Sequence, residues 1–150
     1  MVDKLELVSL KGRGRAEAVR LMLVYSKCPF VDTRLTIAEW KLRKKKDGFT
    51  EETKLPVLVV NNNYRIIGVY EISKYVAEKN APTIRATLTK NYEERLSWAD
   101  IALIEVLTRL QSCYDSFYLA HFPVLKEYCN RFESLPHVRP YIQCRPETHF

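Results

Sequence analysis

Apolar and polar residues recur along the first half of this 150-residue chain with the spacings of short strands and amphipathic helices. Strand-like runs occur at residues 4–10, 30–36, 57–60 and 64–69. Helix-like runs, with apolar residues three or four positions apart, occur at residues 15–27, 37–46 and 70–79. The order is therefore βαβ followed by αββα, which predicts an α/β N-terminal domain.

A proline stands directly before the apolar run Val57-Leu58. Proline lacks the N–H that a sheet ladder needs, so it is tolerated at the first residue of a strand but not inside it. We predict that the Leu55–Pro56 bond is cis, since cis bonds are almost confined to proline. The N–H and C=O before such a corner would then face a cleft and could pair with an extended, peptide-like ligand. This corner is typical of a thioredoxin-like fold.

The second half of the chain has helical spacing throughout. Ser97 and Asp100 form a capping-box pattern at the start of a helix that runs to about Tyr114. Ile101, Ile104, Leu107 and Leu110 lie on one stripe of it. Two further helices are predicted, at residues 122–134 and 136–144. Residues 80–83 are interpreted as a linker. We therefore expect a thioredoxin-like domain at 1–80, a linker or short remnant at 81–95, and a shortened all-α domain at 96–150.

Composition places the chain among ordinary globular proteins, with 47% apolar and 28% charged residues. No apolar run is long enough to span a bilayer, and the N-terminus has no signal pattern, so we expect a cytoplasmic protein without a membrane partner. The four cysteines are scattered and form no CxxC motif. That excludes a dithiol redox motif and a structural zinc site, and it predicts free thiols and no metal.

The net charge of +6 lies entirely in residues 1–80, much of it between Lys41 and Lys46. Basic blocks attract anionic ligands and nucleic acid. No aromatic-rich RNA motif or recognition-helix pattern accompanies this block, so we interpret it as a solvated helix face and expect no nucleic-acid partner.

Several segments, in this order, resemble the cytosolic glutathione transferases. They are Arg13-Gly14-Arg15-Ala16-Glu17, Ala38-Glu39-Trp40, Lys54-Leu55-Pro56-Val57-Leu58, Leu96-Ser97-Trp98-Ala99-Asp100, Leu135-Pro136 and Arg145-Pro146-Glu147-Thr148. The chain is most similar to the sigma class, which includes prostaglandin D synthase. The resemblance implies N- and C-terminal transferase domains, glutathione as co-substrate, a small hydrophobic electrophile, a detoxification role and a homodimer.

Two departures from the family separate this chain from an ordinary member. Family members place a pair of long helices between the linker and the Ser-x-x-Asp helix, where this chain has only residues 82–95. Those helices form much of the substrate pocket and the dimer interface, so the resemblance implies a weakened dimer. The second departure concerns the glutathione site: the tyrosine of the sigma pattern is Ser9 here, and its Gln-Ser pair falls on Gly68 and Val69.

The resemblance assigns the catalytic positions to Ser9 and Arg15. A serine hydroxyl steadies the glutathione thiolate in other classes of the superfamily, and the charge of Arg15 would help. Two simpler interpretations remain open: Ser9 as a polar residue that ends a strand, and Arg15 as an exposed cation near Glu17 or Asp3.

The remaining glutathione contacts also follow from the resemblance. Trp40 and Lys44 lie four residues apart on one helical face and would hold the glycine carboxylate. Lys54, Leu55 and Pro56 would contact the tripeptide backbone. At position 69, valine lacks the family's hydroxyl, which predicts about ten- to a hundredfold weaker glutathione binding; a shift of one residue in the alignment would place Tyr70 there instead.

Two functions are consistent with this pattern. The first is a glutathione transferase that conjugates or isomerises small electrophiles, and it is favoured by the pair Trp40 and Lys44. The second is a catalytically silent binding or structural protein on the same fold, and it is favoured by Ser9 and Val69.

Overall fold

The computed structural model describes residues 3–88, 96–113 and 117–146. Its strands form one mixed sheet in the order β2-β1-β3-β4. They are β1 (Leu5–Leu10), β2 (Phe30–Leu35), β3 (Val57–Val60) and β4 (Tyr64–Ile67). β1 runs parallel to β2 and antiparallel to β3, and β4 is antiparallel to β3. This mixed sheet and its flanking helices confirm the thioredoxin-like fold predicted for the N-terminal part.

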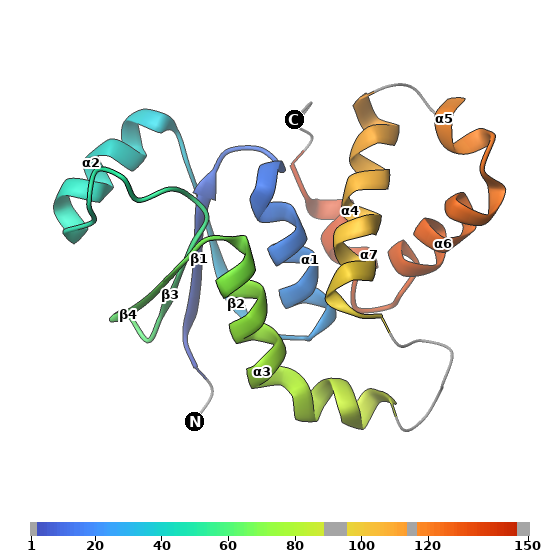
Figure 1. The fold of residues 1–150 in the computed structure, drawn as a ribbon, viewed down its shortest axis with the longest axis horizontal. Helices are drawn as coiled ribbons and strands as arrows, with labels where there is room; N and C mark the ends of the chain where they lie inside the picture. The colour runs from blue at the N-terminus through green and yellow to red at the C-terminus, as the bar shows by residue number, and fades with distance from the viewer. Residues whose placement is uncertain (1–2, 89–95, 114–116, 147–150) are drawn as a thin grey trace.

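Three helices flank this sheet. A single turn of 3₁₀ helix, η1 (Gly14–Ala16), leads into α1 (Glu17–Tyr25), and α2 (Ile37–Asp47) follows β2. The third is α3 (Val69–Leu88). Figure 1 shows α1 and α3 on one side of the sheet and α2 on the other.

Side-chain alternation along β1 and β3 divides the core between these two faces. Leu7 and Leu58 are fully buried and belong to the large cluster that includes residues of α1 and α3. Val8 and Val57, one residue along, belong to a smaller cluster with Trp40 of α2. This is the two-residue period of a sheet buried on both faces.

The C-terminal part is helical, as predicted. Its helices are α4 (Trp98–Cys113), α5 (Phe117–Ala120), α6 (Pro123–Glu133) and α7 (Arg139–Cys144). α4 packs against α1 on one side and α6 on the other. The capping box is confirmed: the Ser97 N–H donates to Oδ2 of Asp100 at 2.6 Å, and the Asp100 N–H donates to Oγ of Ser97 at 3.3 Å.

The predicted linker is wrong at the level of secondary structure. α3 continues to Leu88 and passes through residues 80–83. The boundary predicted at residue 80 therefore falls inside a helix, although Pro82 removes one helical N–H donor and Figure 1 shows the helix bent along its length. Residues 89–95 of the predicted segment, and Glu147 and Thr148 of the family-like C-terminal segment, lie outside the described residues.

Three smaller differences concern the C-terminal helices. Leu110 has the spacing of the buried stripe of its helix but is 46% exposed, whereas Ile101 and Ile104 are buried. The last helix begins at Arg139 instead of Pro136, and the short helix α5 is not predicted by the sequence. The predicted end of α4 near Tyr114 lies outside the described residues.

Within the part of the chain that the structure describes, no helix is long and apolar enough to cross a membrane. Among the cysteines whose side chains the structure describes, Cys28, Cys129 and Cys144 form no disulfide.

Candidate functional site

A cavity of about 280 Å³ opens at the end of β1, where the chain turns into α1. Ser9 and the turn residues Arg13 and Arg15 line one part of it, and Leu55 and Pro56 line another. α4 contributes Arg109 to the same wall. Residues far apart in sequence thus meet here because β1 ends beside the beginning of the antiparallel strand β3.

Sheet register explains why Ser9 and Pro56 lie together. Val8 pairs with Val57 in the antiparallel ladder, so the residue after Val8 comes opposite the residue before Val57. The Leu55–Pro56 bond is cis, as predicted. The Pro56 carbonyl accepts a hydrogen bond from the Gly68 N–H at 3.1 Å, which holds the beginning of α3 beside this corner.

The Ser9 hydroxyl is engaged within the protein. It is 2% exposed, it donates to the Leu10 carbonyl at 3.2 Å, and it accepts a hydrogen bond from Nη2 of Arg20. To donate to a ligand, this hydroxyl must turn its proton away from the Leu10 carbonyl, while the Arg20 contact can remain.

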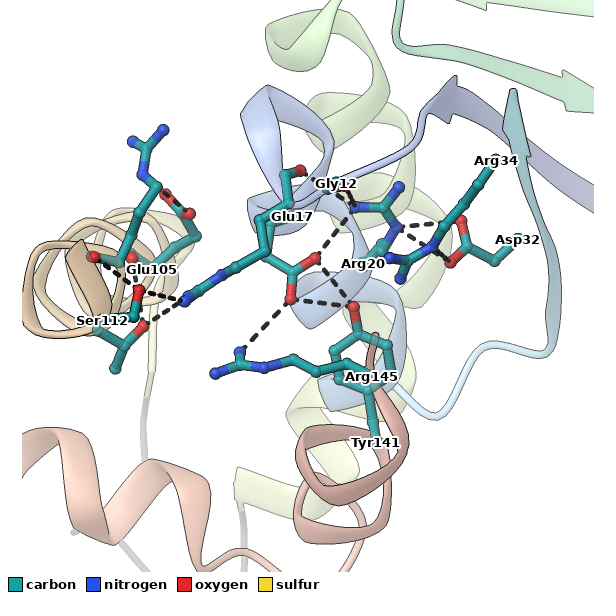
Figure 2. Close-up of polar contacts among 12 residues, drawn as sticks. Gly12, Glu17, Arg20, Asp32, Arg34, Glu105, Ser112, Tyr141 and Arg145 are labelled. Atoms are coloured by element: carbon teal, nitrogen blue, oxygen red, sulfur yellow. Dashed lines mark hydrogen bonds and ion pairs between the residues drawn. The ribbon is translucent and has the colours of Figure 1, made fainter. Parts of the chain in front are cut away.

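Arg20 is fully buried and organises the ion network behind the cavity. Its Nε donates to both carboxylate oxygens of Asp32, at 3.0 and 3.1 Å, and its Nη1 lies 3.0 Å from Oε2 of Glu17. Figure 2 shows Glu17 between Arg20 on one side and Tyr141 and Arg145 on the other. A buried cation needs such partners, since an unpaired charge in the interior is strongly destabilising.

Glu17 joins this network to the C-terminal helix. The Tyr141 hydroxyl donates to both Glu17 oxygens at 3.0 Å, and Nη1 of Arg145 lies 3.5 Å from Oε1. Burial, followed by the charge of Glu17, raises the pKa of Tyr141 above its ordinary value, so the phenol stays a donor at neutral pH. The sequence does not predict this network, since Glu17 is recognisable there only as part of a family-like motif.

α4 holds the cavity loop through Arg13. The buried Arg13 guanidinium donates to Oγ1 of Thr108 at 3.0 Å and to Oγ of Ser112 at 3.3 Å. Nearby, Oε1 of Glu105 lies 3.4 Å from Nε of Arg109. Burial raises the pKa of Glu105, although the charges of Arg109 and Arg13 act to lower it. The sequence predicts a role for none of these four α4 residues, because their relevance depends on packing between distant segments.

Four of the eight predicted site residues line the cavity: Ser9, Arg15, Leu55 and Pro56. Arg15 is exposed and forms no ion pair with a carboxylate in the described part of the chain. Its exposure agrees with the simpler interpretation of an exposed cation, and Glu17 pairs with Arg20 and Arg145.

Trp40 and Lys44 meet on one face of α2, as their spacing predicts, but they do not line the cavity. The Lys44 Nζ lies 6.0 Å from the centre of the Trp40 ring. It donates to the Glu51 carbonyl at 2.7 Å and lies 3.3 Å from the Glu51 carboxylate. Lys44 is thus buried and already holds a carboxylate of this chain.

Lys54 and Val69 also lie outside the cavity lining. Lys54 is exposed, directly before the cis corner, and Val69 is the half-buried first residue of α3. The first N–H groups of a helix have no partner within it, so the backbone at Val69 offers donors that its side chain does not.

Parts of the chain are similar in sequence to known proteins. Residues 91–145 match the family described as "Glutathione S-transferase, C-terminal domain". Over 79 residues, or 52% of this chain, the sequence is 32% identical to S-crystallin SL18 of Nototodarus sloanii. That match spans 24% of the curated relative, about a quarter of its length.

Solved structures show the same fold over nearly the whole chain. A nematode-specific GST of C. elegans superimposes with a TM-score of 0.76 at 18% identity, over 99% of this chain and 100% of that one. The monomeric glutathione S-transferase Na-GST-3 of Necator americanus gives 0.75 at 20% identity, over 98% and 100%. Prostaglandin synthase D of Nilaparvata lugens gives 0.73 at 19% identity, over 97% and 100%.

Proposed function

We propose that this chain, which belongs to the glutathione transferase family, binds glutathione with its thiol in the cavity between Ser9 and Pro56. One observation carries the proposal: Lys11, Arg13, Arg15 and Arg109 line this cavity, and none of its described lining residues is acidic. Neighbouring cations favour the thiolate over the thiol, and each unit by which a thiol pKa falls corresponds to about 1.4 kcal/mol.

The rest of the tripeptide would extend away from the cavity along the sheet edge. The backbone of Leu55 would pair with the cysteinyl unit, and Lys54 would lie alongside it. The γ-glutamyl carboxylate would accept from the backbone N–H groups at Val69, where α3 begins. That carboxylate site lacks a hydroxyl, so we expect weak binding.

The glycine carboxylate would bind at Trp40 and Lys44. There it would take the place of the Glu51 carboxylate, whose side chain is 80% exposed and can move into solvent. Support for this contact comes from the Lys44 ammonium, which already holds a carboxylate in that position.

In the proposed reaction the thiol proton passes to solvent and the sulfur forms a bond to the electrophilic carbon. Where the electrophile carries a leaving group, that group departs with the electron pair of its bond. Arg15 would stabilise the thiolate by charge, and Ser9 would turn its hydroxyl from the Leu10 carbonyl to the sulfur. We propose a sigma-like transferase acting on small hydrophobic electrophiles in the cytoplasm, in a detoxification role.

A second function, a catalytically silent protein on the same fold, is favoured by one observation. The Ser9 hydroxyl is buried and satisfied within the protein, so the thiolate would lack a ready donor. Such a protein would bind glutathione or serve a structural role without turnover.

We further propose that the chain self-associates weakly, as a homodimer with a reduced interface. Support comes from the short stretch at residues 82–95, where family members place a helix pair of the dimer interface. Sedimentation velocity at increasing protein concentration tests this; a stable dimer at nanomolar concentration would contradict it.

The functional experiment combines calorimetry with a conjugation assay. Glutathione is titrated into the wild type, Arg15→Gln and the control Arg139→Gln, which changes an exposed arginine of α7 away from the cavity. We expect binding in the wild type and the control and weaker binding in Arg15→Gln. Turnover of chlorodinitrobenzene then separates enzyme from silent protein; absence of binding at millimolar glutathione would refute the proposal.

A further inference from the structure

Arg20 lies behind the cavity and hydrogen-bonds to Ser9, one of the residues that line it. We propose that Arg20 is a positioning residue for the thiol chemistry: it holds the Ser9 oxygen in place and leaves the hydroxyl proton to turn toward the glutathione sulfur. The inference rests on the proposed function, because positioning of Ser9 matters only where Ser9 donates to a bound thiolate.

The two hydrogen bonds of the Ser9 hydroxyl engage its oxygen and its proton separately. A guanidinium has donors and no acceptor, so Arg20 binds only the oxygen and never the proton. The proton is donated to the Leu10 carbonyl, with 3.2 Å between the two oxygens. An O–H···O hydrogen bond usually measures about 2.5–3.0 Å. The oxygen is therefore anchored by a charged donor, whereas the proton is held weakly and can be redirected to a ligand.

Partners on the other edges of the guanidinium fix where Arg20 points. Its Nε donates to both carboxylate oxygens of Asp32, at 3.0 and 3.1 Å. Its Nη1 donates to Oε2 of Glu17 at 3.0 Å and to the Arg13 carbonyl at 3.1 Å. Figure 2 shows Arg20 between Glu17 and Asp32. Arg20 cannot turn away from Ser9 without breaking these contacts, so Nη2 is a fixed donor to the serine oxygen.

The forked shape of the guanidinium suits this task better than a simple cation. Lysine would keep the positive charge, but its three donors share one nitrogen and cannot reproduce the fork that contacts Asp32, Glu17 and Ser9 together. The carboxylates of Glu17 and Asp32 lie against the guanidinium and oppose its charge. We therefore expect Arg20 to act on the thiol through Ser9 and not through its charge.

The consequence is a coupling between Arg20 and Ser9 in the pKa of the bound glutathione thiol. A hydroxyl that donates to the thiolate stabilises it, so loss of this donor raises the thiol pKa. If Arg20 acts through Ser9, a change at Arg20 affects the thiol mainly while the hydroxyl is present. A merely structural Arg20 would affect the thiol equally with and without that hydroxyl.

A double-mutant cycle measures this coupling. The pKa of the bound glutathione thiol is determined by ultraviolet difference absorbance in the wild type, Ser9→Ala, Arg20→Lys and the double variant, each checked for folding by circular dichroism. Arg34→Lys is the matched control. Arg34 belongs to the same network and, among the described residues, hydrogen-bonds at 2.7 Å to Asp32 and not to Ser9.

We expect Arg20→Lys to raise the thiol pKa by about one unit when Ser9 is present. In the Ser9→Ala background the same change should raise it by less than about half as much. Arg34→Lys should leave the thiol pKa unchanged. Equal rises in both backgrounds, no rise with Ser9 present, or an equal rise in Arg34→Lys overturns the inference.

Asp32→Asn provides a second variant, which tests the inference even if Arg20→Lys does not fold. Asp32 is partly exposed and asparagine keeps its shape, so this change loosens the hold on Arg20 without removing the guanidinium. By charge alone, loss of an anion lowers the thiol pKa, whereas loss of positioning raises it. We expect a rise with Ser9 present and none in Ser9→Ala; the same change in both backgrounds overturns the inference.

The outcomes distinguish this inference from the proposed function. Glutathione binding with a thiol pKa that does not respond to Ser9→Ala, or with no coupling in the cycle, overturns the role of Arg20 and leaves glutathione binding intact. Absence of binding by the wild type at millimolar glutathione overturns the proposed function, and the role of Arg20 with it.

Discussion

Arg13 donates a hydrogen bond from Nη2 to Oγ1 of Thr108, at 3.0 Å and across 95 residues of sequence. Both residues are buried. The first belongs to the turn that lines the cavity and the second to α4. The helical part of the chain therefore fixes one wall of the site, and a change on α4 will alter the site without touching a ligand.

The first prediction concerns this contact. Thr108→Val removes the acceptor of a buried charged donor, which should lower the free energy of unfolding by about 1–3 kcal/mol. Glutathione affinity should fall as well, because the cavity turn loses an anchor. Urea unfolding and calorimetry measure the two effects. Ser112→Ala is the matched comparison, since its exposed hydroxyl makes the longer bond of 3.3 Å; an equal effect of both changes would contradict this assignment.

The second prediction separates the two interpretations of Ser9. Ser9→Ala removes the acceptor for Arg20, so the free energy of unfolding should fall by about 1–3 kcal/mol. If the hydroxyl also turns to the sulfur, the pKa of the bound glutathione thiol should rise, and we predict that it rises less than in Arg15→Gln. Thermal unfolding and an absorbance titration of the thiolate measure both. A stability loss with an unchanged thiol pKa would leave Ser9 a structural residue.

Most of the fold follows from local sequence. β3 begins and ends where the alternation and the proline predict, and the capping box of Ser97 and Asp100 is formed as predicted. Gly48 ends α2 in the left-handed conformation, with φ at 68°, which glycine adopts readily at the end of a helix. These features depend on neighbouring residues, which is why sequence alone reveals them.

Features that depend on tertiary packing were not predictable. Leu110 has the spacing of a core residue but is exposed, whereas the polar residues Thr108 and Glu105 of the same helix are buried. Pro82 indicated a linker, but α3 continues through it. The cations of the cavity come from the turn after β1 and from α4, and only the fold brings them together.

A third prediction concerns the carboxylate site of Lys44. Glu51→Gln weakens the internal carboxylate that a ligand must displace, so glutathione should bind about two- to fivefold more tightly. The Glu51 carbonyl still accepts from Lys44, so stability should change little. Calorimetry tests this, with the exposed neighbour Glu52→Gln as control. Unchanged affinity would place the glycine carboxylate elsewhere.

A fourth prediction uses the pKa shift of Asp100. Hydrogen bonds from Ser97, and then from Tyr128 at 2.6 Å, hold the pKa of this carboxyl below its usual range. Because the pKa of Asp100 is lower in the folded state, its carboxylate stabilises the fold at pH values above the unfolded-state pKa of about 3.9. This stabilisation is lost as the pH falls through the folded-state pKa. Asp100→Asn should therefore reduce stability at pH 7 and flatten its loss in acid.

Glu105 provides the opposite case and serves as the control for Asp100. Burial raises the pKa of Glu105 in the folded state. Its contribution to stability is therefore present below the unfolded-state pKa of about 4.3 and is lost as the pH rises through the folded-state pKa. Glu105→Gln should be more stable than the wild type at pH values above the folded-state pKa of Glu105. It should show no gain in stability below the unfolded-state pKa. Thermal unfolding between acid and neutral pH measures both variants; parallel curves for the variants and wild type would contradict the assigned shifts.

The central claim is that the cationic cavity at Ser9 and Pro56 holds the glutathione thiol as a thiolate. Its most direct test is the pKa of that thiol in the bound state, measured by ultraviolet difference absorbance. The pKa of a free thiol is about 8.5, and we predict a lower pKa for the thiol of bound glutathione. This pKa should return toward that of the free thiol in Arg15→Gln but not in Arg139→Gln. A bound thiol that titrates as in solution would contradict the claim.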